Sequence, residues 1–143
     1  MNQFEKAYQE KCRLAAKMEN AKTEEERDEA QREYDGFITD LEEVSTIDDI
    51  AYREVWINYK ESRNNGNSIL VFQGSTDLQD LLVRVMRAED IRTFALAGNP
   101  EPLEDTIKFI KSGCRITGAR KVVTLKTVEG EETFEPALIF MIP

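Results

Sequence analysis

Residues 68–86 read SILVFQGSTDLQDLLVRVM, and this stretch decides the fold of the second half of the chain. It begins with a continuous apolar run, Ile69 to Phe72, which is short enough for a buried strand and is closed by Gly74. A polar turn follows. Next comes a helical repeat of apolar residues, Leu78, Leu81, Leu82, Val85 and Met86. We therefore expect a buried strand and then a helix whose start is capped by Thr76 and Gln79.

The residues after this unit repeat the same pattern once. Residues 93–97 (TFALA) form a second apolar run, which ends at Gly98. A second helix is then predicted to end at residues 112–113, and its marks are Leu103, Ile107 and Ile110. This order predicts two parallel strands joined by a helix.

The last thirty residues are predicted to contain strands alone. Residues 114–128 form a long strand whose inward-facing set changes phase across Gly118–Ala119, which predicts a bulge there. A hairpin loop at residues 129–132 leads to a final strand over residues 137–142. Pro136 cannot donate a ladder hydrogen bond, so we expect it at the start of that strand or at a bulge.

The first half of the chain has helical periodicity. One amphipathic helix is expected from Asn2 to about Ala21, and a second begins at Thr23, where TEEE matches a capping box. The 4-3-4-3 spacing in the second helix predicts a helical hairpin, through Ala30, Tyr34, Phe37, Leu41 and Val44.

A third helix is expected over residues 45–65, with Gly66 just past its end. Its apolar residues cover most of the circumference, which is typical of a helix packed between other elements. Trp56 should therefore lie in the interior. We place this helix between the hairpin and the sheet.

These elements predict an α+β fold, in which an N-terminal three-helix segment packs on a small mixed sheet of order β-α-β-α-β-β. We expect one domain over residues 1–143, with an acidic helical segment (1–66) and an α/β segment (67–143). The two later helices should cover one face of the sheet and the N-terminal helices the other.

Charge is concentrated in the first half of the chain. The formal net charge is -9; residues 1–66 hold 17 acids and 10 bases (-7), whereas residues 67–143 hold 11 acids and 9 bases (-2). Such a field repels phosphate backbones and anionic lipid, so direct nucleic-acid or membrane binding is disfavoured and a basic protein surface is favoured. No apolar run approaches the ~20 residues of a membrane span, and the first residues lack the pattern of a signal peptide, so we expect a cytoplasmic protein.

The residue types that carry most catalysis and metal binding are scarce. The chain has no histidine, and its two cysteines, Cys12 and Cys114, are far apart in the sequence. Neither has a histidine base, and no zinc-ligand spacing is present. We expect no catalytic residue, metal or cofactor, and the prediction leans away from an enzyme.

The turn after the first strand is one candidate site. Gly74, Ser75 and Thr76 lie between a buried strand and a helix start, where free amides could receive a phosphate or carboxylate. The alternative is ordinary helix capping by Thr76, since no lysine stands where a P-loop needs one.

The acidic hairpin is the other candidate, with Asp28, Glu29, Glu42 and Glu43 as the partner-binding residues. Three functional hypotheses follow: a non-enzymatic interaction or accessory module that docks a basic protein surface, a nucleic-acid mimic that inhibits a DNA- or RNA-binding enzyme, and a small-ligand or enzymatic domain that uses the turns at Gly74 and Gly98. Four basic residues on the long strand read as edge-strand charges that oppose aggregation: Arg115, Arg120, Lys121 and Lys126.

Three segments carry a resemblance to other proteins. They are DIRTFAL (90–96), SGCRITG (112–118) and PALIF (136–140), and they resemble small uncharacterised proteins carried by gut Firmicutes and their mobile elements. The resemblance covers about the last 75 residues and contains no catalytic motif. It implies an accessory role and assigns no site residue.

Overall fold

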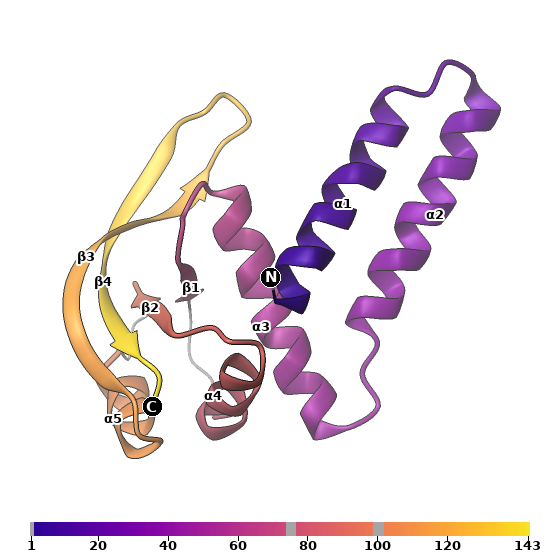
Figure 1. Cartoon of the computed structure of the whole chain (residues 1–143). Coiled ribbons are helices and arrows are strands. Elements are labelled where there is room, and N and C mark those ends of the chain that lie inside the picture. Colours follow the sequence, from indigo (N-terminus) through magenta and orange to yellow (C-terminus); the bar gives the residue numbers. More distant parts are fainter. Residues whose placement is uncertain (1, 74–76, 99–101) are drawn as a thin grey trace.

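The computed structural model describes residues 2–73, 77–98 and 102–143, and it has an α+β fold (Figure 1). Three helices come first, followed by a strand–helix pattern and two final strands. The elements are α1 (Gln3–Glu19), α2 (Glu24–Glu42), α3 (Ile47–Asn64), β1 (Leu70–Gln73), α4 (Gln79–Ala88), β2 (Thr93–Ala97), α5 (Pro102–Lys111), β3 (Arg115–Lys126) and β4 (Glu132–Met141). The predicted element order is confirmed. No helix in the described ranges is long and apolar enough to cross a bilayer.

The three N-terminal helices begin at side-chain caps. The Asn2 side chain accepts from the Glu5 amide at 2.8 Å, and the Thr46–Asp49 pair forms a complete capping box. At α2 the Thr23 hydroxyl accepts from the Glu26 amide as predicted, but the Glu26 carboxylate accepts from the Lys22 amide at 3.1 Å. The local sequence therefore fixes all three helix starts.

Helix α4 begins later than predicted. Its N-cap residue is Leu78, two residues after the predicted cap at Thr76. Thr76 lies outside the described residues. The Gln79 side chain is buried and donates to Asp105 of α5 at 3.0 Å, so it joins two helices.

The four strands form one mixed sheet of order β1-β2-β4-β3. β1 and β2 are parallel, whereas β4 is antiparallel to both β2 and β3, as the sequence predicts for the last two strands. The register shifts between Ile116 and Gly118, so a bulge lies immediately before the predicted pair Gly118–Ala119. A second shift, between Val123 and Leu125, was not predicted.

β4 is longer than predicted because the hairpin continues past the end of β2. Pro136 lies inside β4 opposite Lys121, so its placement at the strand start is wrong. However, β4 pairs with β2 only from Ala137 onward, so Pro136 lies just beyond the shared segment.

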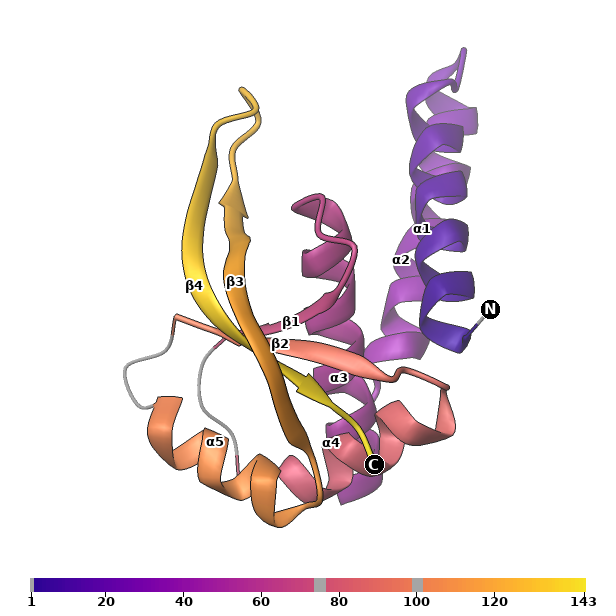
Figure 2. The same ribbon diagram turned by 60° about the vertical axis from the view of Figure 1, so that its left-hand side comes forward.

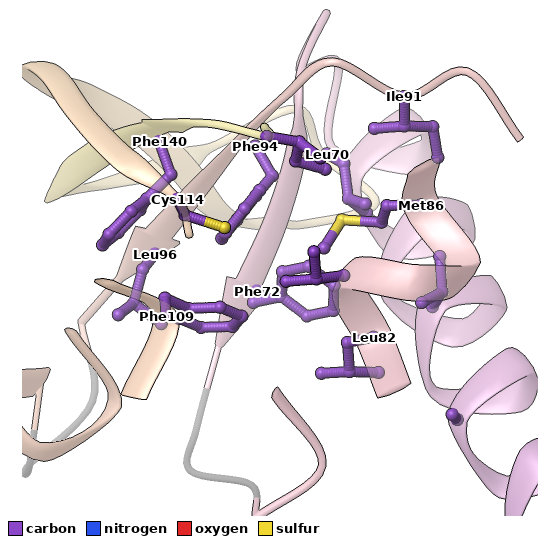
Figure 3. Packing of buried hydrophobic residues seen from close by; sticks show 14 of the residues in the cluster. Leu70, Phe72, Leu82, Met86, Ile91, Phe94, Leu96, Phe109, Cys114 and Phe140 are labelled. Carbon is purple, nitrogen blue, oxygen red and sulfur yellow. The ribbon is translucent and has the colours of Figure 1, made fainter. Parts of the chain in front are cut away.

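One face of the sheet carries the main core (Figure 3). Alternate residues of the strands, Phe72, Phe94 and Phe140 among them, point to this face and pack on Phe109 of α5. The rings of Phe94 and Phe140 stack with centroids 5.1 Å apart. The same cluster includes buried residues of α1, α3, α4 and α5: Phe4, Ala51, Val55, Trp56, Leu82, Val83, Met86 and Phe109.

The opposite face is covered by the sheet itself, so the prediction that the N-terminal helices cover it is wrong. Its inward side chains are small, mostly alanine and valine, and Val122 of the curled β3 packs among them. The Asn67 side-chain amide bonds to both the N–H and the C=O of Val123, at 3.1 and 2.7 Å. The Gln73 side chain donates to the Thr124 carbonyl at 3.2 Å, so β3 curls back toward β1. The inward residues are Val71, Ala95, Ala97, Val122 and Ala137.

Helix α5 turns a different face to the core from the one its pattern suggests. Its buried residues are Asp105, Thr106 and Phe109. The stripe that predicted the helix is exposed: Leu103 by 72%, Ile107 by 46% and Ile110 by 48%. The Phe109 ring and the Gln79–Asp105 hydrogen bond set the rotation of the helix, because they anchor a face about a third of a turn away from the stripe.

Helices α1 and α2 form the predicted hairpin, which projects from the body as an arm (Figures 1 and 2). Their shared surface is thin, with Leu14 and Ala30 buried along it and Tyr34 and Phe37 only partly buried. α3 lies between the arm and the sheet, as predicted, and Trp56 is fully buried.

Candidate interaction surface

The outer side of α2 carries an acidic face made of Glu24, Glu25, Asp28 and Asp35. Glu24, Asp28 and Asp35 follow one stripe of the helix at steps of four and seven residues, and Glu25 lies beside it. All four side chains are exposed, and none has an ion-pair partner in the described part of the chain. The face is therefore net negative, with four acids and Arg32, which lines the same hollow as Glu24, Glu25 and Asp28.

The two helices of the arm differ in charge. α1 contains three acids and four bases (+1), whereas α2 contains nine acids and two bases (-7). Bases of α1 meet α2 at its inner edge, where Lys17 Nζ lies 2.7 Å from Glu33 and Arg13 lies 3.7 Å from the same carboxylate. The outer side of α2 has no such neighbours, and its charge faces solvent.

The four residues proposed from the sequence do not form one surface. Asp28 belongs to the acidic face, whereas Glu29 lines a hollow between α1 and α2 together with Lys17 and Asn20. Glu42 is partly buried and bonded to Lys60 of α3 at 3.1 Å. Glu43 is exposed at the C-cap of α2. Sequence spacing could not identify Lys60 as a partner, because the contact depends on how the arm meets α3.

The base of the arm is fixed by side chains that join α1 to α3. The Phe4 ring lies 4.8 Å from Tyr52 and 5.9 Å from Tyr59, between centroids. The Tyr59 hydroxyl donates to Glu5, and the same carboxylate pairs with Arg63 at 3.0 Å. Burial and then the Glu5 hydrogen bond raise the pKa of Tyr59 well above its ordinary range. These contacts hold the acidic face in one orientation relative to the body.

The carboxyl ends of the parallel strands form the second candidate region. The predicted anion-binding residues Gly74, Ser75 and Thr76 lie outside the described residues. Next to this turn, Lys108 bonds to Asp77 at 2.7 Å and the Ser112 hydroxyl donates to Asp80. These groups line a hollow of about 230 Å³, which is below the usual size of a ligand pocket. Its charged groups are largely engaged with one another.

Reactive groups are few in the described part of the chain. Cys114 is buried, and burial raises the pKa of its thiol to about 11, so it is neutral at physiological pH. Cys12 is exposed on α1. Among the described residues, no group of three or more Cys, Asp or Glu is arranged to hold a metal ion.

Comparison with known proteins adds no relative. No protein-family model, curated protein or solved structure matches this chain.

Proposed function

We propose that the chain is a non-enzymatic interaction module that docks a basic protein surface on the acidic face of α2. The observation that carries this proposal is the four exposed, unpaired acids on the outer side of a projecting arm. Exposed charges contribute little to the fold, here mainly through Glu24 and Glu25 in the first turn of α2, and they raise the rate of association with an oppositely charged surface. The arm reaches solvent on its outer side, so a partner can approach without displacing any element of the body.

A nucleic-acid mimic is the narrower form of this proposal. Negative charges repeated along one helix face can occupy a groove that normally receives phosphates. In that case the partner is a DNA- or RNA-binding enzyme, and nucleic acid competes for the same surface. A partner that binds the chain equally well in the presence of nucleic acid supports the broader proposal, an interaction module that docks a basic protein surface.

The test is affinity capture from a lysate of the producing organism with three forms of the chain. The first is the wild type, and the second neutralises the acidic face through Glu24→Gln, Glu25→Gln, Asp28→Asn and Asp35→Asn. The third is a control with the same net charge that changes four exposed acids elsewhere, Glu61→Gln, Glu129→Gln, Glu131→Gln and Glu132→Gln.

We expect the wild type and the control to retain a partner that the face-neutralised form loses. Excess DNA or RNA should release that partner only if the mimic form is right. Equal capture by all three forms would contradict the proposal, provided that circular dichroism shows all three folded.

A small-ligand function is the second candidate, and the buried Gln79–Asp105 hydrogen bond at the ends of β1 and β2 favours it. Open α/β sheets usually place ligands at that edge. A thermal-shift screen with nucleotides, sugar phosphates and carboxylates tests it. A ligand that stabilises the wild type but not Gln79→Ala would support it, and the absence of any shift across the screen would contradict it.

A further inference from the structure

A second surface, on α5 and β3, combines exposed aliphatic side chains with positive charge. From Leu103 to Lys126 the chain holds six bases and two acids, the exposed Glu104 and the buried Asp105. Helix α5, which carries the exposed stripe, contacts β3, where Ile116 is exposed by 44%. Exposed aliphatic residues that cluster in this way mark interaction sites more often than isolated ones do.

The aliphatic residues and two of the bases lie on one side of the sheet. Ile116 pairs with Phe140, whose ring contacts Phe109 of α5, so Ile116 points to the side that α5 occupies. Lys121 pairs with Pro136, four residues before Phe140, and therefore points to the same side. Lys111 follows Ile107 by one helical turn and also lines the hollow that contains Asp77 and Asp80. We call this surface the basic-apolar face: Leu103, Ile107, Ile110, Lys111, Ile116 and Lys121.

The connection between α2 and α3 has the complementary composition. From Asp40 to Tyr52 the chain holds five acids and no base. Ile47 and Ile50, one turn apart on α3, are exposed by 59% and 43%. Glu43 and Asp48 flank them, are exposed, and have no ion-pair partner within the described ranges. We call Glu43, Ile47, Asp48 and Ile50 the acidic-apolar corner.

We propose that the chain associates with a second copy of itself by seating the acidic-apolar corner of one copy on the basic-apolar face of the other. Charge decides between the possible pairings, because two basic-apolar faces or two acidic-apolar corners would place like charges together. The heterologous pairing sets Glu43 and Asp48 against Lys111 and Lys121, and it removes isoleucine side chains of both copies from water.

This contact does not involve the acidic face of α2. Because it joins two different surfaces, each added copy leaves one corner and one face open, so copies add into a ring or a chain. The acidic face stays on the outside of such an assembly and remains open to a partner of another kind.

Sedimentation equilibrium over a concentration series up to about 1 mM tests the proposal. We expect the average mass to rise with concentration at about 0.15 M salt, where the repulsion between two copies of net charge -9 is screened. A corner-reversed variant (Glu43→Lys, Asp48→Lys) and a face-reversed variant (Lys111→Glu, Lys121→Glu) should each associate at least tenfold more weakly than the wild type. Mixed in equal amounts, the two variants should associate again.

Four further outcomes bear on the proposal. A wild type that stays monomeric at every concentration would overturn it, as would folded variants whose mixture stays monomeric. Ile107→Glu, which places an acid within the aliphatic stripe, should weaken association of the wild type without changing its circular dichroism. The face-neutralised form with Glu24, Glu25, Asp28 and Asp35 replaced should associate like the wild type, which separates this contact from the proposed function.

Discussion

The body of the molecule and its helical arm bury very different amounts of apolar side chain. The body, made of the sheet with α3 to α5, fully buries Trp56, Phe94, Phe109 and Phe140. The arm, made of α1 and α2, buries Leu14 and Ala30 along its length, and Phe4 at its base belongs to the core of the body. The outer side of α2 therefore has few packing requirements, so its sequence can serve recognition.

The largest expected effect lies at the junction of the two regions. Trp56→Ala should lower the free energy of unfolding by roughly 3 to 5 kcal/mol, because it empties a fully buried site of the main core. Denaturant unfolding followed by circular dichroism measures this loss. A cost below about 1 kcal/mol would mean that α3 does not join the arm to the sheet in the way described.

A smaller and more local effect is expected within the arm. Leu14→Ala should cost roughly 2 to 3 kcal/mol, since Leu14 is buried between two helices that bury little else. Amide exchange should quicken in α1 and α2 while β2 and β4 keep their protection. Equal acceleration in the strands would show that the arm and the body unfold as one unit.

A pH effect is expected in the body, at Cys114. Burial raises the pKa of this thiol from its ordinary value of 9.0 to about 11, so the folded state holds the proton more tightly than the unfolded state does. The stability should therefore be complete below pH 9 and should fall by about 2 kcal/mol as the pH rises toward 11. Cys114→Ala should show a shallower decline than the wild type in parallel unfolding curves. If the stabilities of the wild type and Cys114→Ala fall equally with pH, the Cys114 thiol does not cause the decline.

The smallest effect is expected on α2 itself. An alanine Cβ at Gly36 would meet no atom within 4 Å, so the position needs no glycine for packing. Gly36→Ala should raise stability by about 0.5 to 1 kcal/mol through helix propensity alone. A loss measured by thermal unfolding would reveal a contact on the outer side of the arm that the fold does not show.

Local sequence patterns predict where helices and strands begin and end far better than they predict which side of each element is buried. The caps at Asn2, Thr23 and Thr46 are short-range, so the starts of the three N-terminal helices could be predicted from the sequence. The exposure of the apolar stripe on α5 could not be predicted in this way. Phe109 and the buried carboxylate of Asp105 set the rotation of the helix through contacts with residues distant in sequence. The covering of the second sheet face by the curled β3 could not be predicted either, because it also depends on contacts distant in sequence.

The candidate surface was predicted in part. The acidity of α2 follows from composition, and Asp28 belongs to the face that the structure presents. Charge alone predicts Glu42 on that surface. In the structure Glu42 instead bonds to Lys60, a contact that depends on the angle between the arm and α3. Glu24, Glu25 and Asp35 could have been preferred from helical spacing, since they share one side of α2 with Asp28.

We propose that the body carries the stability and the acidic face of α2 carries the recognition. The most direct test is the association rate constant with the captured partner, measured between about 0.05 and 0.5 M salt for the wild type, the face-neutralised form and the control of equal net charge. We expect a steep decline with salt for the wild type and the control, and a slow, nearly flat response for the face-neutralised form. The unfolding free energies should agree within about 1 to 2 kcal/mol, since Glu24 and Glu25 lie in the first turn of α2. The same steep decline in all three forms would contradict it, since recognition would then lie outside the acidic face.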